Sequence, residues 1–249
     1  MHENKMKLID EYKQQIDSFR PMSTDALAQL KAYYKVSLTY TSNALEGNSL
    51  TLTETKIIIA DGITIGGKPI KEHLEVIGHS DAYDLLYDLS AGKDITEEEI
   101  LQLHHLFYKN VNEEKAGVYR DCNVIITGSE FALPKYTEVP KLMKEFSDNI
   151  SKMKQQYHPV EFAARLHEGL VTIHPFVDGN GRAARLLMNL ALLQAGYNIT
   201  IIPPIVRNDY IEALQEAQIN NNKEPFINFI SEMVLESQKD YLRLLNALN

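Results

Sequence analysis

The sequence predicts an all-α protein of about eight helices. Apolar residues recur at spacings of three and four through most of the 249 residues, which is the period of an amphipathic helix. Thr96 begins the run Thr-Glu-Glu-Glu, a capping box that opens a helix, and Pro159 stands where another helix would begin. Gly and Pro residues separate the periodic segments. We therefore expect a single domain over residues 1–249.

Four helices are predicted in the first part of the chain, at residues 23–45, 53–60, 70–90 and 96–108. Ser23 or Thr24 can cap the first helix, and Gly47 follows its end as a residue suited to a C-cap. Thr53 is the expected cap of the second helix. These segments account for most of the chain before residue 110.

The stretch 117–136 has a different character. Two short runs, 117–120 and 123–127, have the pattern of extended segments with a turn, and Gly128 follows them. They predict a small β-hairpin. Helices resume after Thr137, and further helices are predicted at residues 159–173, 181–193, 207–221 and 224–248.

Composition excludes several classes of function. The net charge of −9 argues against a general nucleic-acid binder. Cys122 is the single cysteine, so no disulfide can form within the chain. No run approaches the ~20 apolar residues that span a membrane, and the N-terminus is polar. We expect a cytoplasmic protein that binds neither nucleic acid nor membrane.

Residues 174–185, HPFVDGNGRAAR, carry the clearest chemistry. The Gly-Asn-Gly turn at 179–181 leads into a predicted helix, and the backbone N–H groups at such a helix start bind anions. Arg182 and Arg185 are three residues apart, so they project from the same side of that helix. Their planar guanidinium groups suit phosphate, which predicts a site for a chain of phosphates.

Two further side chains lie at the edges of this turn. Asp178 directly precedes the glycines and could hold a Mg²⁺ ion that also touches phosphate oxygens. His174 could take a proton from an incoming hydroxyl. Alternatively, Asp178 is an ordinary turn residue and His174 a helix-terminal cap. The combination favours phosphate-transfer chemistry on a nucleotide.

The segment matches the signature HPFx(D/E)GNGRxxR at every defined position and so resembles the Fic family. The resemblance implies an all-helical Fic fold with a β-hairpin flap, and an Mg²⁺- and ATP-dependent protein adenylyltransferase. Such an enzyme moves AMP from ATP onto a Ser, Thr or Tyr hydroxyl of a protein. It also implies these roles: His174 as general base, Asp178 as Mg²⁺ ligand, Gly179, Asn180 and Gly181 as the anion hole, and Arg182 and Arg185 as ligands of the β- and γ-phosphates.

Residues 42–47, Ser-Asn-Ala-Leu-Glu-Gly, resemble the inhibitory pattern (S/T)xxxE(G/N) of the same family. The resemblance implies an inhibitory helix at about 23–47 and a catalytic core at about 95–235. Within this pattern Ser42, Glu46 and Gly47 match, and Glu46 would pair with Arg185 and block the γ-phosphate. The other interpretation of Glu46 is a surface glutamate at a helix end.

Further contacts follow from the family's flap and from the helix after residue 206. The flap lies in front of the active site in the family, which would bring Thr127, Gly128, Ser129 and Glu130 near ATP or the target. Tyr210 is either an adenine contact or a core tyrosine, and Gln218 is a second candidate for a polar adenine contact. The other histidines, at 104, 105, 158 and 167, are expected to be structural.

Other functions remain open. Glu46 could position water for the reverse reaction, which would make the protein a de-AMPylase. A different transferred group is a second alternative, although the intact Gly181 and Arg182 argue against the kinase variant of the family. A third is a non-enzymatic nucleotide-binding or interaction protein, which would have no need of His174. A zinc hydrolase is disfavoured because no third ligand accompanies His174 and Asp178.

The expected partners are ATP and a protein that carries the target hydroxyl. The resemblance also allows auto-AMPylation, in which the protein itself is the target. Relatives often assemble into dimers, so the resemblance further implies a homodimer.

Overall fold

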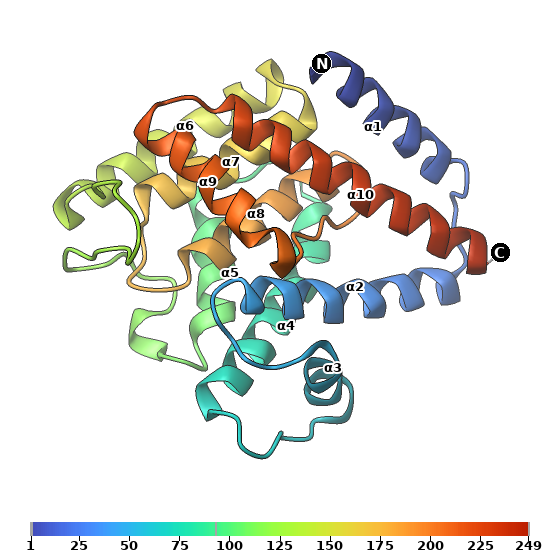
Figure 1. Cartoon of the computed structure of the whole chain (residues 1–249), viewed down its shortest axis with the longest axis horizontal. Coiled ribbons are helices and arrows are strands. Elements are labelled where there is room, and N and C mark those ends of the chain that lie inside the picture. The colour runs from blue at the N-terminus through green and yellow to red at the C-terminus, as the bar shows by residue number, and fades with distance from the viewer. Residues whose placement is uncertain (1, 93, 249) are drawn as a thin grey trace.

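The computed structural model describes residues 2–92 and 94–248. Ten α-helices are found within these ranges, compared with the eight or so predicted. They are α1 (His2–Asp17), α2 (Thr24–Ala44), α3 (Leu52–Asp61), α4 (Ile70–Ser90), α5 (Glu97–Tyr108), α6 (Val139–Gln156), α7 (Pro159–Ile173), α8 (Asn180–Gln194), α9 (Arg207–Ile219) and α10 (Glu224–Leu248). Figure 1 shows their arrangement.

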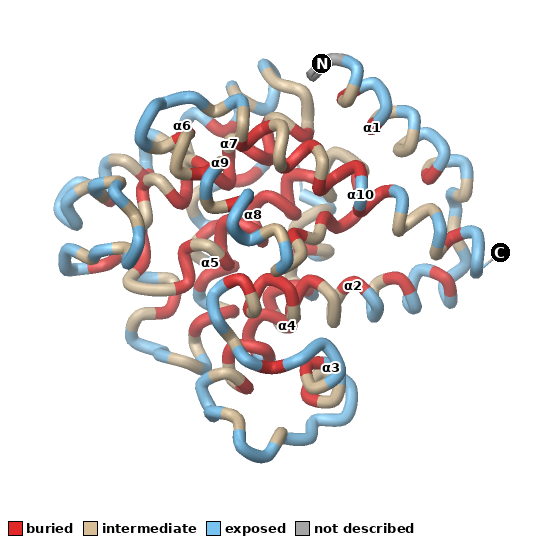
Figure 2. Tube along the Cα trace, viewed as in Figure 1, coloured by how far each residue is buried: buried red, intermediate tan, exposed pale blue. Residues whose placement is uncertain are grey.

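Helices α7 and α8 form the centre of the molecule. These two helices pack against one another. Helices α2, α4 and α5 pack against α8, and helices α6, α9 and α10 pack against α7. Figure 2 shows the buried residues gathered around these two helices. Nearly the whole of α8 is buried, including both of its arginines, because neighbouring helices surround it. The loop between α7 and α8 is therefore held between two well-packed, largely buried helices.

Helix α1 is a helix that the sequence analysis did not predict. Met6, Ile9 and Ile16 lie on one face and are buried. That face packs along α10, and Figure 1 shows the two helices side by side. The segment joins the common hydrophobic core, so the core extends almost to the N-terminal end of the chain.

Helix α3 begins earlier than predicted. Its cap is Thr51 and not Thr53: the hydroxyl of Thr51 accepts from the backbone N–H of Glu54, and the Glu54 carboxylate accepts from the backbone N–H of Thr51. This reciprocal pair satisfies two free N–H groups of the first turn, which a cap at Thr53 would leave unpaired. Helix α3 packs on α2 and α4.

The prediction of a β-hairpin at 117–136 is wrong, because none of the described residues forms a strand there. The segment is an irregular loop fastened at its base by Arg120. The Arg120 guanidinium donates to the carbonyls of His174, Cys122 and Pro134, at 2.8, 3.1 and 2.6 Å. Ile125 is 93% exposed and its neighbours Val124 and Ile126 are only half-buried, so the β-branched run lacks the close packing that stabilises a strand.

No helix in the described part of the chain is both long and apolar enough to cross a lipid bilayer.

Candidate functional site

The loop that joins α7 to α8 is closed by its own side chains. His174 ends α7 in the left-handed conformation, with φ of 53°, and its N–H donates to the carbonyl of Leu170. Asn180 then bonds both backbone groups of Phe176: its Nδ2 donates to the carbonyl and its Oδ1 accepts from the N–H, each at 2.9 Å. These bonds turn the chain directly into α8.

Phe176 supports the loop from inside the protein. Its ring is fully buried and stacks on the His104 ring, with the centroids 3.6 Å apart. The Nδ1 atom of His104 accepts from the N–H of Gly117, so the ring proton lies on Nε2 and is donated to the carbonyl of Asp178 at 3.0 Å. Burial lowers the pKa of His104 to about 4, so the ring is neutral at pH 7. His104 is structural, as expected.

The N-terminus of α8 faces a carboxylate of the protein itself. Gly179 is the N-cap residue and has a φ of 80°, which favours glycine. A side chain on Gly181 would collide with Oε1 of Glu46, so this carboxylate lies directly against the first turn of α8. The position is where the free N–H groups and the positive end of the helix dipole attract an anion.

Glu46 also contacts Arg185, 139 residues further along the chain. Its Oε1 lies 2.6 Å from Nη2 of Arg185. Ser42 completes the contact: its hydroxyl accepts from Nε of Arg185 at 3.0 Å and its carbonyl from Nη2 at 2.8 Å. Burial opposes ionisation of Glu46, but the guanidinium of Arg185 outweighs it and lowers the pKa of the carboxyl. Both groups are therefore charged at pH 7.

The other edge of Arg185 contacts Tyr210 on α9. Nη1 of Arg185 donates to the Tyr210 hydroxyl at 3.4 Å, and this hydroxyl lies 2.9 Å from Nε2 of His167. Because arginine can only donate, the hydroxyl accepts from it and gives its own proton to His167. Tyr210 is 3% exposed. The structure thus places it in the core behind Arg185.

Arg182, the other arginine of the motif, is held by protein groups on α4 and α2. Its Nη1 lies 2.9 Å from Oε1 of Glu75 and donates to Oδ1 of Asn43 at 3.2 Å. The guanidinium also lies over the ring of Phe107, 4.5 Å from the centroid. The Arg182 side chain is 3% exposed, and Glu75 is buried as well. Arg182 is thus already paired with an anion inside the protein.

Asp178 is the carboxylate at the edge of the loop. Its Oδ1 accepts from the N–H of Gly179 at 2.7 Å and lies 3.4 Å from Nη2 of Arg182. Its Oδ2 lies 3.4 Å from both the Lys71 ammonium and the Tyr108 hydroxyl. Burial raises the pKa of Asp178, but Arg182 and Lys71 outweigh this and lower it. The group is a hard, ionised oxygen ligand beside an anion site, which fits Mg²⁺ bound through one carboxylate plus phosphates.

His174 lies in a half-buried position whose surroundings keep its ring neutral. Burial lowers its pKa to about 4, although the carbonyl of Val171 and the carboxylate of Glu46 oppose the change. Its Nδ1 is buried and makes no hydrogen bond of good geometry. At pH 7 the imidazole therefore has a free lone pair and can accept a proton.

The candidate flap residues lie further out. Thr127 and Gly128 form the turn of the loop and are exposed, and the side chain of Gln215 on α9 donates to the Gly128 carbonyl at 3.3 Å. Ser129 accepts from the N–H of Phe131 through its hydroxyl, and Glu130 is exposed. Gln218 donates to the Thr172 hydroxyl at 3.3 Å, on the side of α9 that faces α7.

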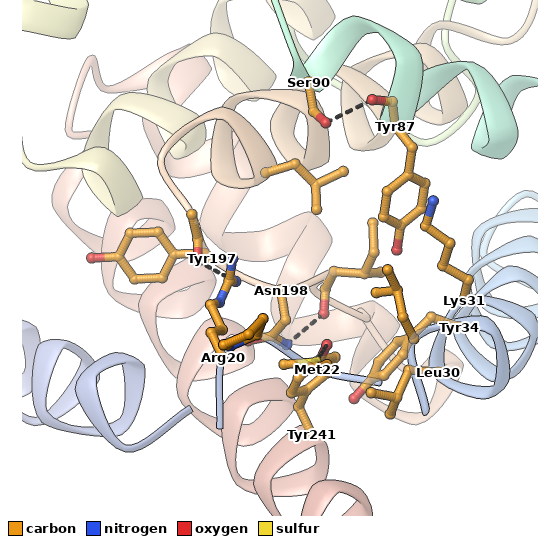
Figure 3. A pocket seen from close by; sticks show the side chains of 15 residues that line it. Arg20, Met22, Leu30, Lys31, Tyr34, Tyr87, Ser90, Tyr197, Asn198 and Tyr241 are labelled. Carbon is orange, nitrogen blue, oxygen red and sulfur yellow. Dashed lines mark hydrogen bonds between the residues drawn. The ribbon is translucent and has the colours of Figure 1, made fainter. Parts of the chain in front are cut away.

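A cavity of about 750 Å³ lies away from these residues. It is lined by the first half of α2, the end of α4 and the loop after α8, and Figure 3 shows its tyrosines and two cationic side chains. Ser42 lies near the other end of α2, and Glu46 lies in the turn that directly follows this helix. None of the candidate site residues lines this cavity.

The sequence analysis missed the residues that α4 contributes. Lys71 and Glu75 are one helical turn apart and reach Asp178 and Arg182 from more than 100 residues away. Their spacing is that of any exposed lysine–glutamate pair, so no local pattern marks them. Asn43 was within the inhibitory pattern, at a position that the pattern leaves open.

A model of the Fic/DOC family matches residues 94–192. A protein adenylyltransferase Fic from Nematostella vectensis is 36% identical over 237 residues, which cover 94% of this chain and 55% of that protein. The same named enzyme from Drosophila melanogaster is 36% identical over 222 residues and is covered over 44% of its length. The chain thus spans about half the length of the curated relatives it matches.

Two solved structures are similar over nearly the whole chain. A substituted form of Fic-1 (aa134–508) from C. elegans is 30% identical with a TM-score of 0.84, and the match covers 98% of this chain and 73% of that one. A Fic domain containing signaling protein from Bacteroides thetaiotaomicron VPI-5482 is 28% identical with a TM-score of 0.88, and the coverage is 96% and 98%. The likeness therefore includes α1 and α10, outside the region that the family model matches.

Proposed function

This chain belongs to the Fic/DOC family, and from that membership and the geometry at the start of α8 we propose that it is a protein adenylyltransferase restrained by Glu46. The observation that carries the proposal is the Glu46 carboxylate lying against Gly181 and Arg185. An internal anion at a helix N-terminus beside a buried arginine supports a site made for phosphate. The names of the curated relatives support AMP as the transferred group.

The proposed reaction uses ATP and a hydroxyl of a target protein. His174 accepts the hydroxyl proton while the hydroxyl oxygen forms a bond to the α-phosphorus of ATP. The bond from that phosphorus to the β-phosphate oxygen breaks, and pyrophosphate leaves with the bonding electrons. The products are an AMP ester of the protein and pyrophosphate. Negative charge near the imidazole raises its pKa, so bound phosphates would make His174 a stronger base than it is in the free protein.

Positioning and charge stabilisation supply most of the proposed catalysis. The N–H groups at the start of α8, with Gly179 and Gly181 leaving room for close approach, would bind the phosphates. Arg185 would bind the γ-phosphate once Glu46 leaves it. Arg182 is paired with Glu75 and lies beside Asp178, so it would support the site mainly by orienting Asp178.

Asp178 is the proposed ligand of Mg²⁺, with the phosphate oxygens as the other main ligands. The ion, when bound, neutralises charge on the phosphates and on the leaving pyrophosphate. The fit rests on the ionised Oδ2 at the edge of the loop, next to the phosphate position. Tyr108 and Lys71 orient this oxygen in the protein itself.

Inhibition by Glu46 has a direct physical cause in this proposal. The carboxylate occupies Arg185 and repels the γ-phosphate, so ATP can bind productively only after the pair breaks. Arg185 is 2% exposed and Glu46 36% exposed, which places the pair between the surface and buried classes. Breaking it should cost more than the ~1 kcal/mol of an exposed pair and less than the ~3–5 kcal/mol of a fully buried one.

The test is incubation of the protein with Mg²⁺ and α-labelled ATP, with cell lysate as a source of targets. We compare wild type with Glu46→Gly and His174→Ala, and with both changes combined. Strong label in Glu46→Gly, faint label in wild type and none in either His174 variant is the expected result. Equal label in wild type and Glu46→Gly would overturn inhibition, and label that survives His174→Ala would overturn the proposed base.

De-AMPylation is the second candidate, favoured by the ionised and partly exposed carboxylate of Glu46 beside the anion site. Such a carboxylate could orient a water molecule toward the phosphorus of an AMP ester. Glu46→Gln keeps the size and one acceptor oxygen but loses the charge and the second acceptor oxygen. Loss of AMP release from a pre-modified protein in this variant, with no gain in transfer, would favour removal over addition.

The target, the assembly and the location belong to the proposal as well. The target is a protein with a hydroxyl side chain, and auto-modification is the first case to examine by mass spectrometry of the Glu46→Gly protein. A homodimer and a cytoplasmic setting remain predictions. Light scattering of the purified chain and fractionation of cells that express it would check them.

A further inference from the structure

The ammonium of Lys71 lies against the oxygen of Asp178 that points away from the loop. Lys71 stands in the first turn of α4, and its Nζ lies 3.4 Å from Oδ2 of Asp178. The same Nζ lies 3.8 Å from Oε1 of Glu75. It is therefore placed between two carboxylates, which is where a free cation would be most strongly attracted.

The two oxygens of Asp178 are not equivalent. Oδ1 accepts from the N–H of Gly179 at 2.7 Å and faces Arg182, so the fold of the loop uses it. Oδ2 faces only the Tyr108 hydroxyl and the Lys71 ammonium among the described residues, both at 3.4 Å. A divalent cation must therefore approach through Oδ2, the oxygen that Lys71 covers.

Lys71 can leave this position at low cost. Its side chain is 57% exposed and lies at the surface, so the ammonium loses little hydration in either position. Glu75 is held in place when Lys71 moves, because its carboxylate is buried, lies 2.9 Å from Arg182 and accepts from Nδ2 of Asn48 at 3.1 Å. The movable member of this group of charges is thus the lysine.

We propose that Lys71 is a resident cation that competes with the divalent ion for Asp178 and sets the metal concentration at which the site fills. This inference rests on the proposed function only in taking Asp178 as the metal ligand. In the metal-free protein the ammonium neutralises Asp178, and the incoming ion displaces it into solvent. The consequence is that removal of the Lys71 charge strengthens metal binding.

The experiment uses Mn²⁺ without nucleotide and observes the whole 249-residue chain by NMR. Mn²⁺ accepts the same carboxylate ligands as Mg²⁺, and it broadens the signals of nearby amides. The readout is the Mn²⁺ concentration that half-broadens the Gly179 amide, whose nitrogen bonds Asp178 directly. Lys71→Met should lower this concentration several-fold, up to about fivefold, which is the range of an exposed ion pair. Lys71→Arg should behave as wild type, because it keeps both charge and reach.

Two controls separate competition from a general change of charge. Lys35→Met removes a lysine that pairs with Asp84, also on α4, at 2.6 Å, and it should leave the Gly179 titration unchanged. Asp178→Asn should abolish the selective broadening. The proposal fails if Lys71→Met matches wild type, if Lys35→Met tightens binding equally, or if Gly179 is not broadened in any variant. The titration contains no ATP, so a negative result would not count against the proposed transfer activity. Conversely, absence of transfer in the labelled-ATP assay would not change what the Mn²⁺ titration shows.

Discussion

A side chain on Gly181 and the carboxylate of Glu46 would occupy the same space, although the two residues are far apart in the chain. The first turn of α8 can therefore accept an anion from the protein or one from a ligand, but not both. The same observation predicts the effect of a methyl group at this position, which would exclude each of them.

Gly181→Ala should abolish the gain produced by Glu46→Gly. In the double variant the methyl group stands where the phosphates would approach the N–H groups of α8, so we expect transfer to fall about a hundredfold, as for loss of an anion-hole donor. Labelled-ATP transfer measures it. Gly66→Ala, where nothing lies within 4 Å of the added carbon, is the matched control. Full transfer in the Gly181→Ala double variant would contradict the anion-site assignment.

Glu46→Gly should destabilise the protein while it activates it. The change leaves the buried guanidinium of Arg185 without its carboxylate, which we expect to cost about 1–3 kcal/mol. For a chain of this size that lowers the melting temperature by about 2–4 °C per kcal/mol. Thermal denaturation followed by circular dichroism measures the shift. Mg²⁺-ATP should raise the melting temperature of Glu46→Gly more than that of wild type, and an equal shift in both would argue against blockage of ATP by Glu46.

Transfer by the Glu46→Gly variant should stay nearly constant as the pH falls from 8 to 5.5. The base must be unprotonated, and burial lowers the pKa of His174 to about 4, so the active form is lost only as the pH falls through that value. The Glu46 carboxylate raises the pKa of His174, so its removal can only lower this pKa further below the ordinary value. A histidine of ordinary pKa would lose about tenfold by pH 5.5. Measurement of kcat/KM against pH decides, and a fall centred near pH 6.5 would contradict the prediction.

Tyr210→Phe should weaken ATP binding and lower stability. It removes the hydroxyl that accepts from Arg185 and leaves buried Nε2 of His167 without a partner, at a cost of about 1–3 kcal/mol. In the Glu46→Gly background we expect KM for ATP to rise several-fold, because Arg185 loses one of the contacts that orient it. Tyr12→Phe on α1 serves as the control. An unchanged KM together with unchanged stability would show that the hydroxyl positions nothing.

Most helices could be predicted because their apolar periodicity and their start signals lie within one segment. Helix α1 was missed although Met6, Ile9 and Ile16 have helical spacing, because the residues around them are mostly polar and mask the periodicity. The hairpin at 117–136 was wrong for a related reason. β-Branched residues favour strands only where they can pack, and Ile125 is almost fully exposed.

The residues of the candidate site fall into the same two groups, those that a local sequence pattern marks and those that only tertiary packing brings in. Two short sequence patterns were enough to find the turn at 179–181, Arg185 and Glu46. The last residue of one pattern, Arg185, contacts Glu46 of the other at 2.6 Å. Lys71 and Glu75 could not be found, because their relation to Asp178 and Arg182 arises from the packing of α4 on α8. The burial of Arg182 and Arg185 was equally invisible, since a motif does not record which helices cover its side chains.

The charged side chains that meet at the start of α8 carry no net charge. Three carboxylates balance three cationic groups: Glu46, Glu75 and Asp178 against Lys71, Arg182 and Arg185. A polyphosphate that enters such a neutral cluster makes it strongly negative unless a cation enters with it or a carboxylate departs. If the proposed site binds a nucleotide, electroneutrality makes that binding an ion exchange, in which metal uptake and withdrawal of the Glu46 carboxylate would be two parts of one event.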